Sequence, residues 1–294
     1  MRIGEIVVGT DGTPPGGAAV EWAAREAAHQ RAGVRVVHAY DGDWRSARFD
    51  TTCAFADEDK HLAEAVVNDA ERSVHAISPA VQVLTEAVPG DPTVSLLDAA
   101  EHADLVVIGS RGRTGLAGLA SGKVGRHLIA QAPCPVVVVH GRGDGGTGPV
   151  VAGVDMTDTA EHVLETAFAA AADRGAKLVV AHTYLPVAPL WGIDLPSSAV
   201  AGPDEDAVEH AHVEDLVARW HGKYPRVPVR ILVRTGATAA VLAGLSRDAR
   251  LIVVGHRGHG VVAGALLGST GTYLMHHAEC PVWIARVPAR DQRP

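Results

Sequence analysis

Short apolar runs alternate with longer amphipathic stretches along the whole chain. In the first half the apolar runs are IGEIVVGT, VRVVHAY, VQVLTEAV, DLVVIGS and PVVVVH. Between them lie segments with a helical spacing of apolar residues, namely AAVEWAAREAAHQRA, KHLAEAVVNDAERSVHAI, TVSLLDAAEHA and KVGRHLIAQA. Runs such as DLVVI are apolar at successive positions, which is typical of strands covered on both faces. The alternation predicts an α/β fold with a five-stranded parallel sheet and helices on both sides.

The same series of runs occurs twice. VVGTD at 7–11 matches VAGVD at 151–155, and VVHAY at 36–40 matches VAHTY at 180–184, with a spacing of 144 residues. Later, DLVVIGSRG at 104–112 matches RLIVVGHRG at 250–258, with a spacing of 146 residues. Since solenoid repeats have periods of ~20–50 residues, this longer period indicates two duplicated domains. We assign residues 1–142 and 149–288 to these domains, and the glycine-rich residues 143–148 to a flexible linker.

Composition and charge exclude several classes of protein. The net charge of −8 argues against a nucleic-acid partner, which usually leaves a basic surface. No apolar run approaches the ~20 residues of a membrane span, and the N-terminus has no signal-peptide pattern, so we expect a cytoplasmic protein. Cys53, Cys134 and Cys280 lack metal-ligand spacing, and the sixteen histidines are scattered, which favours core or solvated side chains over a zinc site.

The candidate ligand site lies where the sheet order is expected to reverse. Open parallel sheets bind ligands beyond the carboxyl ends of their strands, at this switch point. Each half has an acid directly after its first strand, Asp11 and Asp155, and a glycine-rich loop after its fourth strand. If the first and fourth strands are neighbours, the acid and the loop face each other across one crevice.

The two glycine-rich loops are GSRGRTGLAGLASGKVG at 109–125 and GHRGHGVVAGALLGSTG at 255–271. Glycine lets backbone N–H groups approach a phosphate closely. The helix that follows each loop adds free N–H groups and the positive end of its dipole. A hydroxyl directly after the last glycine, as in Ser269, can donate to a phosphate or cap this helix. Loops of this length and composition predict two phosphate-binding sites rather than simple tight connections.

The Gly122-Lys123 pair does not form a Walker A motif. That consensus needs four residues between its first glycine and the GK pair, and a Ser or Thr after the lysine. Here only three residues follow Gly118, and Val124 has no hydroxyl for magnesium. A Rossmann motif would normally follow the first strand, where the chain has GTDGTPPGG and GVDMTD instead.

The pattern G-x2-G-x9-G-[ST] after a buried fourth strand resembles the ATP-binding subfamily of the universal stress proteins. The acid that ends the first strand and the closing Cys-Pro-Val strand resemble the same family. The resemblance covers nearly the whole chain and is closest to the tandem-domain form. It implies two doubly wound domains of the adenine nucleotide alpha-hydrolase-like type and a homodimer of chains. Because edge strands tend to find a partner, the closing strands PVVVVH and PVWIAR are candidates to pair the two domains into a pseudo-dimer.

The resemblance also implies roles for individual residues. Asp11 and Asp155 would lie near the nucleotide and its Mg²⁺, a role compatible with capping the next helix. The backbone at Ala39 and Thr183 would contact adenine. Gly109, Gly112, Gly255 and Gly258 would line the ribose and phosphates, and Gly268, Ser269 and Thr270 would bind the phosphates in the second half. The candidates at the matching positions of the first half are Gly122, Lys123 and Val124. Arg111 and Arg257 either reach a phosphate or are solvated.

Lys123 departs from the family pattern because it stands where Ser or Thr is expected. Two interpretations stay open for it, a solvated lysine in a first helical turn or a phosphate contact that offsets its unfavourable position at the helix N-terminus. The second half keeps the expected Ser269. The sequence therefore predicts two unequal sites.

Three functions are compatible with this reading. The leading hypothesis is an ATP-binding stress-response protein in which the nucleotide regulates conformation or partners, with little or no turnover. The alternatives are a slow ATP hydrolase or adenylyl-transferring enzyme, and a protein–protein scaffold with vestigial nucleotide sites. No histidine or carboxylate pair recurs beside both glycine loops as a general base would.

Overall fold

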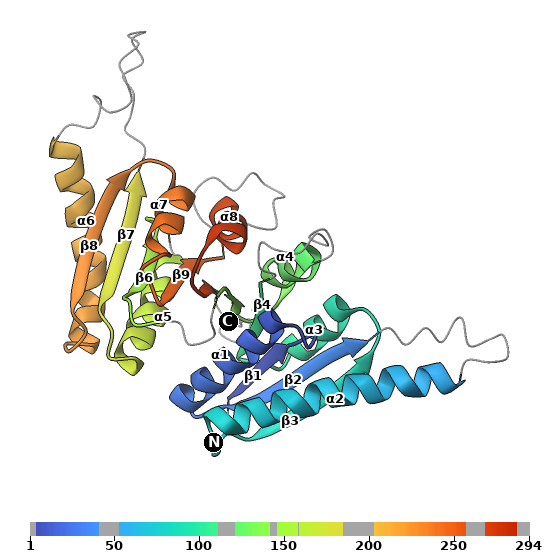
Figure 1. Cartoon of the computed structure of the whole chain (residues 1–294). Coiled ribbons are helices and arrows are strands. Elements are labelled where there is room, and N and C mark those ends of the chain that lie inside the picture. The colour runs from blue at the N-terminus through green and yellow to red at the C-terminus, as the bar shows by residue number, and fades with distance from the viewer. Residues whose placement is uncertain are drawn as a thin grey trace, which may run out of the picture. The chain divides into compact units, whose positions relative to one another are not determined.

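The computed structural model of the chain describes residues 4–40, 53–110, 121–141, 146–157, 159–184, 203–256 and 268–286. The chain divides into two compact units. The first unit comprises Met1–Gly145 together with Arg286–Pro294, and the second comprises Gly146–Ala285. Each unit repeats the alternation of strands and helices that the sequence predicts (Figure 1).

The first unit has strands and helices in strict alternation. Its strands are β1 (Glu5–Gly9), β2 (Gly33–Tyr40), β3 (Val83–Pro89), β4 (Leu105–Gly109) and β5 (Val136–Val139). Its helices are α1 (Pro14–Gln30), α2 (Cys53–Ile77), α3 (Pro92–Ala100) and α4 (Ser121–Gln131).

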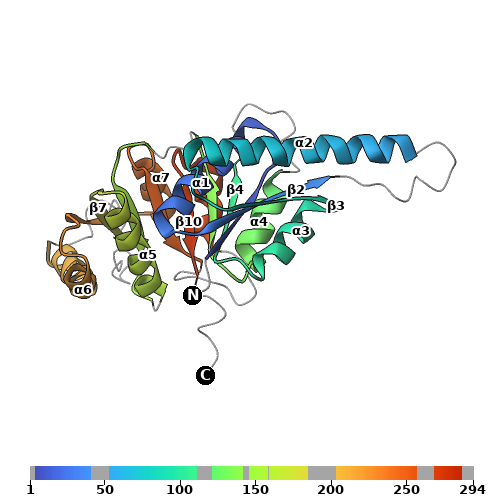
Figure 2. The same ribbon diagram turned by 90° about the horizontal axis from the view of Figure 1, so that it is seen from below.

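The strands of the first unit form a parallel sheet in the order β3-β2-β1-β4-β5. Strand β1 therefore lies between β2 and β4, and the order reverses there. Helices α1 and α2 pack on one face of this sheet and α3 and α4 on the other (Figure 2). Because both faces are covered, successive residues of β1, from Ile6 to Val8, are all buried. The predicted doubly wound fold is confirmed.

The second unit has the same architecture. Its strands are β6 (Val150–Val154), β7 (Leu178–Tyr184), β8 (Val229–Thr235), β9 (Leu251–Gly255) and β10 (Val282–Ala285). Its helices are α5 (Thr159–Asp173), α6 (Pro203–Lys223), α7 (Thr238–Leu245) and α8 (Ser269–His277). The strands pair in parallel in the order β10-β9-β6-β7-β8, so β6 takes the place that β1 has in the first unit.

Two helices begin earlier than their apolar pattern indicates. Helix α1 begins at Pro14 rather than at Ala18. Thr13 before it has an extended backbone, and proline is tolerated in the first turn, where its missing N–H would have no intrahelical partner. Helix α2 begins at Cys53 rather than at Lys60. Among the helices that the structure describes, none is both long and apolar enough to cross a membrane.

The predicted linker at 143–148 overlaps the start of the second unit. Gly148 packs so closely that a Cβ there would lie 1.7 Å from the carbonyl oxygen of Asp248. The Arg250 side chain also donates to the Gly148 carbonyl at 2.8 Å. Gly148 is therefore fixed on the segment before β9, and its glycine is required by this close approach.

Candidate functional site

A cavity of about 250 Å³ opens at the carboxyl ends of the central strands of the first unit. It lies at the point where the strand order reverses, as open parallel sheets place their ligand sites. Its wall combines strand ends, the start of α1, the first turns of α3 and α4, and apolar side chains. The lining residues are Gly9, Thr10, Asp11, Thr13, Pro15, Gly16, Val37, His38, Ala39, Pro92, Leu96, Ile108, Gly109, Val124 and Gly125.

The cavity brings together the two features that the sequence predicts to face each other. Asp11 follows β1 and Gly109 ends β4, and both line it. These strands are adjacent in the sheet, with Gly9 opposite Ile108. The crevice between the acid and the start of the glycine loop is thus confirmed for the first unit.

The N–H and C=O of Ala39 lie on the side of β2 that faces β1, beyond the point where β1 ends. In a parallel sheet the peptide groups of alternate residues point to the same neighbouring strand. The Val37 carbonyl accepts from Thr10 N at 3.1 Å, on the β1 side, whereas the Tyr40 carbonyl accepts from Gly90 N at 2.9 Å, on the β3 side. By this alternation the N–H and C=O of Ala39 point past the end of β1, into the cavity that Ala39 lines.

Thr183 has the same orientation in the second unit. The Lys177 carbonyl accepts from Val150 N at 2.9 Å, so odd-numbered residues of this segment face β6. The Tyr184 carbonyl accepts from Gly236 N at 3.2 Å, on the β8 side. The peptide groups of Thr183 therefore point past the end of β6, and in each unit one residue presents a donor and an acceptor there.

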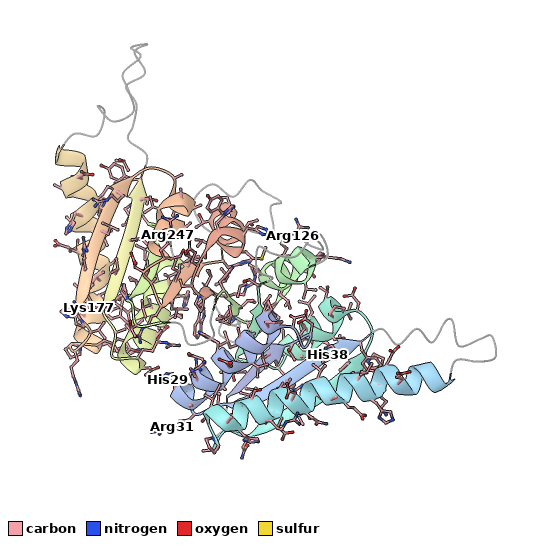
Figure 3. All side chains as sticks on the ribbon, viewed as in Figure 1. His29, Arg31, His38, Arg126, Lys177 and Arg247 are labelled. Atoms are coloured by element: carbon pink, nitrogen blue, oxygen red, sulfur yellow. The ribbon has the colours of Figure 1, made fainter. Side chains whose placement is uncertain are left out.

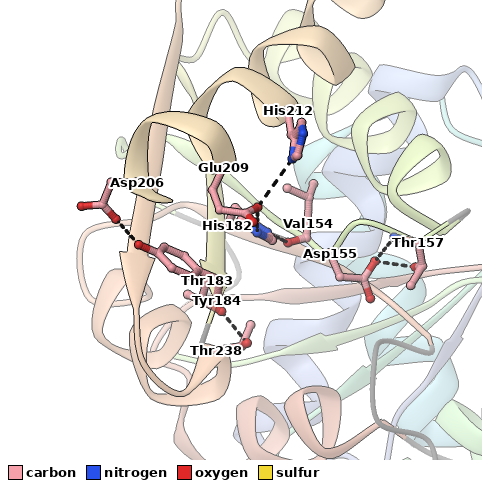
Figure 4. A network of polar contacts seen from close by, with 10 residues as sticks. All are labelled: Val154, Asp155, Thr157, His182, Thr183, Tyr184, Asp206, Glu209, His212 and Thr238. Atoms are coloured by element: carbon pink, nitrogen blue, oxygen red, sulfur yellow. Dashed lines mark hydrogen bonds and ion pairs between the residues drawn. The ribbon is translucent and has the colours of Figure 1, made fainter. Parts of the chain in front are cut away.

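The carboxylates of Asp11 and Asp155 shape the turns that lead to α1 and α5. Asp11 Oδ1 accepts from Thr13 N at 3.1 Å and from the Thr13 hydroxyl. Asp155 Oδ1 accepts from Thr157 N at 3.3 Å and from the Thr157 hydroxyl (Figure 4). Both acids thus form Asx turns two residues long rather than occupying the helix N-cap itself. Asp11 also lines the cavity and is exposed, so the turn leaves its carboxylate accessible to a ligand.

In each unit, a histidine of the second strand contacts a backbone carbonyl at the end of the first strand. His38 Nδ1 contacts the Thr10 carbonyl at 2.8 Å, and His182 Nδ1 contacts the Val154 carbonyl at 3.0 Å (Figure 3 labels His38). A carbonyl oxygen can only accept, so Nδ1 carries the proton in both rings. Sequence reasoning used these histidines only to align the two halves. Their recurrence at a spacing of 144 residues was the signal that could have identified them as positioning residues of the site.

Gly109 is held in place by the backbone of α1. A Cβ at this position would lie 2.2 Å from the Pro15 carbonyl oxygen and 3.0 Å from Gly16 N. Only glycine permits this approach, so Gly109 is required by packing as well as by its place in the cavity wall. Gly255 ends β9 at the matching place. Arg111, Gly112, Arg257 and Gly258 lie outside the described residues.

The first turn of α4 contributes Val124 to the cavity wall, together with Gly125. Gly122 and Lys123 belong to the same turn, and the Lys123 side chain is exposed. Asp91, the N-cap of α3, has a lowered pKa mainly because of hydrogen bonds from Thr93, with a smaller contribution from the Lys123 charge. Lys123 therefore lies beside the cavity and has a carboxylate nearby, and a contact of its ammonium group with phosphate stays a prediction.

In the second unit, Gly268 is the N-cap of α8 and has an extended backbone. Ser269 is the first residue of this helix and is exposed, and Thr270 follows it half-buried. The first turn of α8 thus presents hydroxyls and free N–H groups, the arrangement that favours an anion at a helix N-terminus.

Side chains of α6 form a polar network beside the end of β7 (Figure 4). His182 Nε2 lies 3.2 Å from a carboxylate oxygen of Glu209, and His212 Nδ1 lies 3.9 Å from the same oxygen. The Tyr184 hydroxyl donates to Asp206. The hydroxyl oxygens of Thr183 and Thr238 are 2.5 Å apart. The sequence did not reveal this network, because the partners are separated by long and variable stretches of chain.

Cys134 and Cys280 are buried at the start of β5 and β10. Burial raises the pKa of each thiol to about 12. Reactive cysteines have lowered pKa values and some exposure, so both residues have the character of core side chains.

Comparisons with known proteins agree with this architecture. The model of the universal stress protein family matches residues 3–140 and 147–286. Universal stress protein Rv2005c of Mycobacterium tuberculosis strain H37Rv is 31% identical over 290 residues, which cover 96% of this chain and 96% of that protein. Universal stress protein Rv2623 of the same strain is 32% identical over 293 residues, with 96% of each chain covered.

Among solved structures, a universal stress protein from Archaeoglobus fulgidus DSM 4304 has a TM-score of 0.71 and covers 97% of this chain. That alignment covers 99% of the archaeal chain at 17% identity, and it shows that the fold is shared. The family model and the mycobacterial relatives span both halves of the chain. The chain therefore belongs to the universal stress protein family, whose domain it carries in two tandem copies.

Proposed function

We propose that the cavity of the first unit and the matching site of the second unit bind an adenine nucleotide, ATP foremost, and that the bound nucleotide regulates a stress-response role. One observation carries the proposal. The N–H and C=O of Ala39 point past the end of β1 into a cavity of about 250 Å³, whose lining includes the apolar side chains of Leu96 and Ile108. Adenine presents an acceptor, N1, beside a donor, the 6-amino group, so its edge can pair with both groups of one residue.

The remaining wall suits the other parts of such a nucleotide. Leu96 and Ile108 offer apolar surface for the ring, as ligand pockets commonly do. Val124 and Gly125 follow Ser121, Gly122 and Lys123 at the start of α4, and the N–H groups of these first three residues have no intrahelical partner and favour phosphate. The cavity wall thus includes surfaces that suit both the ring and the phosphates of one nucleotide.

Asp11 is the acidic side chain among the residues that line the cavity. A single carboxylate fits Mg²⁺, which keeps several waters and is commonly held by one or two carboxylates together with substrate phosphates. Asp155 has the same turn geometry in the second unit. When bound, the ion would neutralise phosphate charge, and Asp11 would orient it.

We expect little or no turnover of the bound nucleotide. Asp11 and His38 are the titratable side chains of the described cavity wall, and His38 uses its Nδ1–H to hold the Thr10 carbonyl. A neutral carbonyl, and not a carboxylate, orients the His38 ring at Nδ1, unlike the histidine bases of Ser-His-Asp hydrolytic sites. Sustained ADP release by the purified protein would favour the enzyme alternative.

The proposal is tested on the full-length chain. We expect ATP among the small molecules released by denaturing the purified protein, and saturable ATP binding in calorimetry. Ala39→Phe fills the cavity and should weaken ATP binding at the first site at least about tenfold, since the pocket no longer admits the ring. Val94→Phe, on the exposed face of α3, is the matched control. If the parent neither contains nor binds ATP, a scaffold without nucleotide becomes the better interpretation.

A further inference from the structure

The two sites can be compared position by position because, in each unit, a leucine packs against the same glycine of the first strand. A Cβ on Gly9 of β1 would lie 2.8 Å from a methyl group of Leu96. A Cβ on Gly153 of β6 would lie 2.7 Å from a methyl group of Leu242. These leucines are 146 residues apart, so the internal repeat holds in three dimensions as well as in sequence.

At four matched positions of this repeat, the second unit has a hydroxyl side chain where the cavity wall of the first unit has an apolar one. Gly9, Asp11, Thr13 and His38 recur as the same residue types in the second unit. At four other wall positions the second unit has threonine where the first unit has proline, alanine or valine. These pairs are Pro15 and Thr159, Ala39 and Thr183, Pro92 and Thr238, and Val124 and Thr270.

Two of these threonines form one hydrogen-bonding unit. Thr183 is the next-to-last residue of β7 and Thr238 begins α7, and their hydroxyl oxygens are 2.5 Å apart (Figure 4). One hydroxyl donates to the other, so the pair retains one O–H donor and several acceptor lone pairs. In the first unit the matching Ala39 and Pro92 both line the cavity and have no polar side-chain atoms.

The pair lies beside the peptide groups that we assign to the base. Position 2 of a purine flanks N1, the atom that would face the N–H of residue 39 or 183. A polar group at position 2 would therefore contact Ala39 and Pro92 in the first site, and the two threonines in the second. Burying an amino group against apolar atoms leaves its hydrogens unpaired, whereas a hydroxyl can accept from it.

We propose that the Thr183–Thr238 pair lets the second site accept adenine nucleotides that carry an added 2-amino group, the 2,6-diaminopurine class, which the first site rejects. This inference rests on the proposed nucleotide-binding function. On this inference, the two copies of the site within one chain differ in specificity. The side chains at two matched positions set the specificity of each copy.

The test measures each site separately in the full chain. In the Ala39→Phe chain only the second site should bind nucleotide, and in the Thr183→Phe chain only the first. Calorimetry then compares ATP with 2-amino-ATP, which differ only at position 2. We expect the 2-amino group to weaken binding at the first site about tenfold or more and to leave binding at the second site unchanged or tighter, the range for one unpaired or one paired buried donor.

The decisive variants remove the hydroxyls. In the Ala39→Phe chain, Thr183→Ala with Thr238→Ala should shift the preference about tenfold toward ATP. The control Thr235→Ala, an exposed hydroxyl at the end of β8, should leave it unchanged. Circular dichroism verifies folding, and Ala39→Leu, which adds less bulk, replaces Ala39→Phe if that variant does not fold.

The outcomes separate the two proposals. The same preference at both sites, or a preference that survives loss of both hydroxyls, overturns the specificity inference while nucleotide binding stands. If neither site binds ATP or 2-amino-ATP, the proposed function itself fails. A gain of 2-amino-ATP binding at the first site after Ala39→Thr with Pro92→Thr would support the inference independently.

Discussion

His38 and His182 occupy the same position of the repeat, and each ring donates Nδ1–H to a carbonyl at the end of the first strand. Their neighbours on the covering helix differ. His182 lies against Glu209, with its Nε2 3.2 Å from a carboxylate oxygen. In α2 the place of Glu209 belongs to Ala63, since the buried Val67 and Val213 are likewise 146 residues apart.

Removing the Glu209 carboxylate should destabilise the second unit. Glu209→Ala leaves the buried Nε2 of His182 without its acidic partner, which we expect to cost about 1–3 kcal/mol in the free energy of unfolding, measured with urea. Glu214→Ala is the matched control, because this exposed carboxylate pairs with His210 on the surface and should change stability by less than about 0.5 kcal/mol. Equal effects of the two variants would contradict a role for burial.

The thiols of Cys134 and Cys280 should resist modification in the folded protein. Their pKa values are raised to about 12, so the reactive thiolate is scarce at every pH well below that value and becomes populated only as the pH approaches it. In a Cys53→Ser chain, alkylation at pH 8 should be slow until denaturant is added. Rapid labelling of the native protein would instead indicate that the segment leading into β5 or β10 opens locally.

At the scale of elements, helices α1 and α5 end in the same left-handed turn but with different residues. Arg31 ends α1 with φ of 54°, and Gly175 has φ of 56° at the matching place after α5. The next residue closes the turn in both units, since Ala32 N donates to Ala27 O and Ala176 N donates to Ala171 O, each at 2.9 Å. The left-handed conformation is unfavourable for a side chain with a Cβ, so Arg31 destabilises this turn.

Exchanging these residues should have opposite effects on stability. Arg31→Gly removes the steric cost and should stabilise the first unit by about 0.5–1 kcal/mol, while Gly175→Ala should destabilise the second by a similar amount. Chemical unfolding of the two variants against the parent measures both changes. As a control, Gly222→Ala alters a helical glycine of α6 with open space around it and should not destabilise the chain. A loss of stability in Arg31→Gly would show that the arginine side chain outweighs the turn.

The apolar pattern predicted the five strands and four helices of the first unit, and the repeat extended this architecture to the second, because strands buried on both faces have a strong and simple signal. It placed the start of α1 too late, because Thr13 and the two prolines that begin the helix do not continue the apolar pattern. The site was predictable to the extent that it follows from topology, as Asp11 and Gly109 do. The pairing of Thr183 with Thr238 was not, since it depends on how two elements 55 residues apart meet.

At the scale of the whole molecule, we expect duplication to provide two nucleotide sites that can be inactivated independently. We expect the parent chain to bind two nucleotides in calorimetry, and Ala39→Phe and Thr183→Phe to bind one each. ATP at a concentration of 100 times its dissociation constant should stabilise a single-site chain by about 2.7 kcal/mol, by mass action, and should not stabilise the double variant. A stoichiometry of one in the parent would mean that only one repeat retains the function.

The close packing of Gly109 on Pro15 has a consequence for how sequence motifs in such proteins are interpreted. The first glycine of the loop is demanded by the geometry of the fold, whether or not any ligand is present. A chain that had lost its nucleotide would still need it, so a search that scores this glycine detects architecture and not chemistry. We expect the ligand to be reflected instead in residues that differ between the two units, such as Ala39, Pro92 and their threonine counterparts.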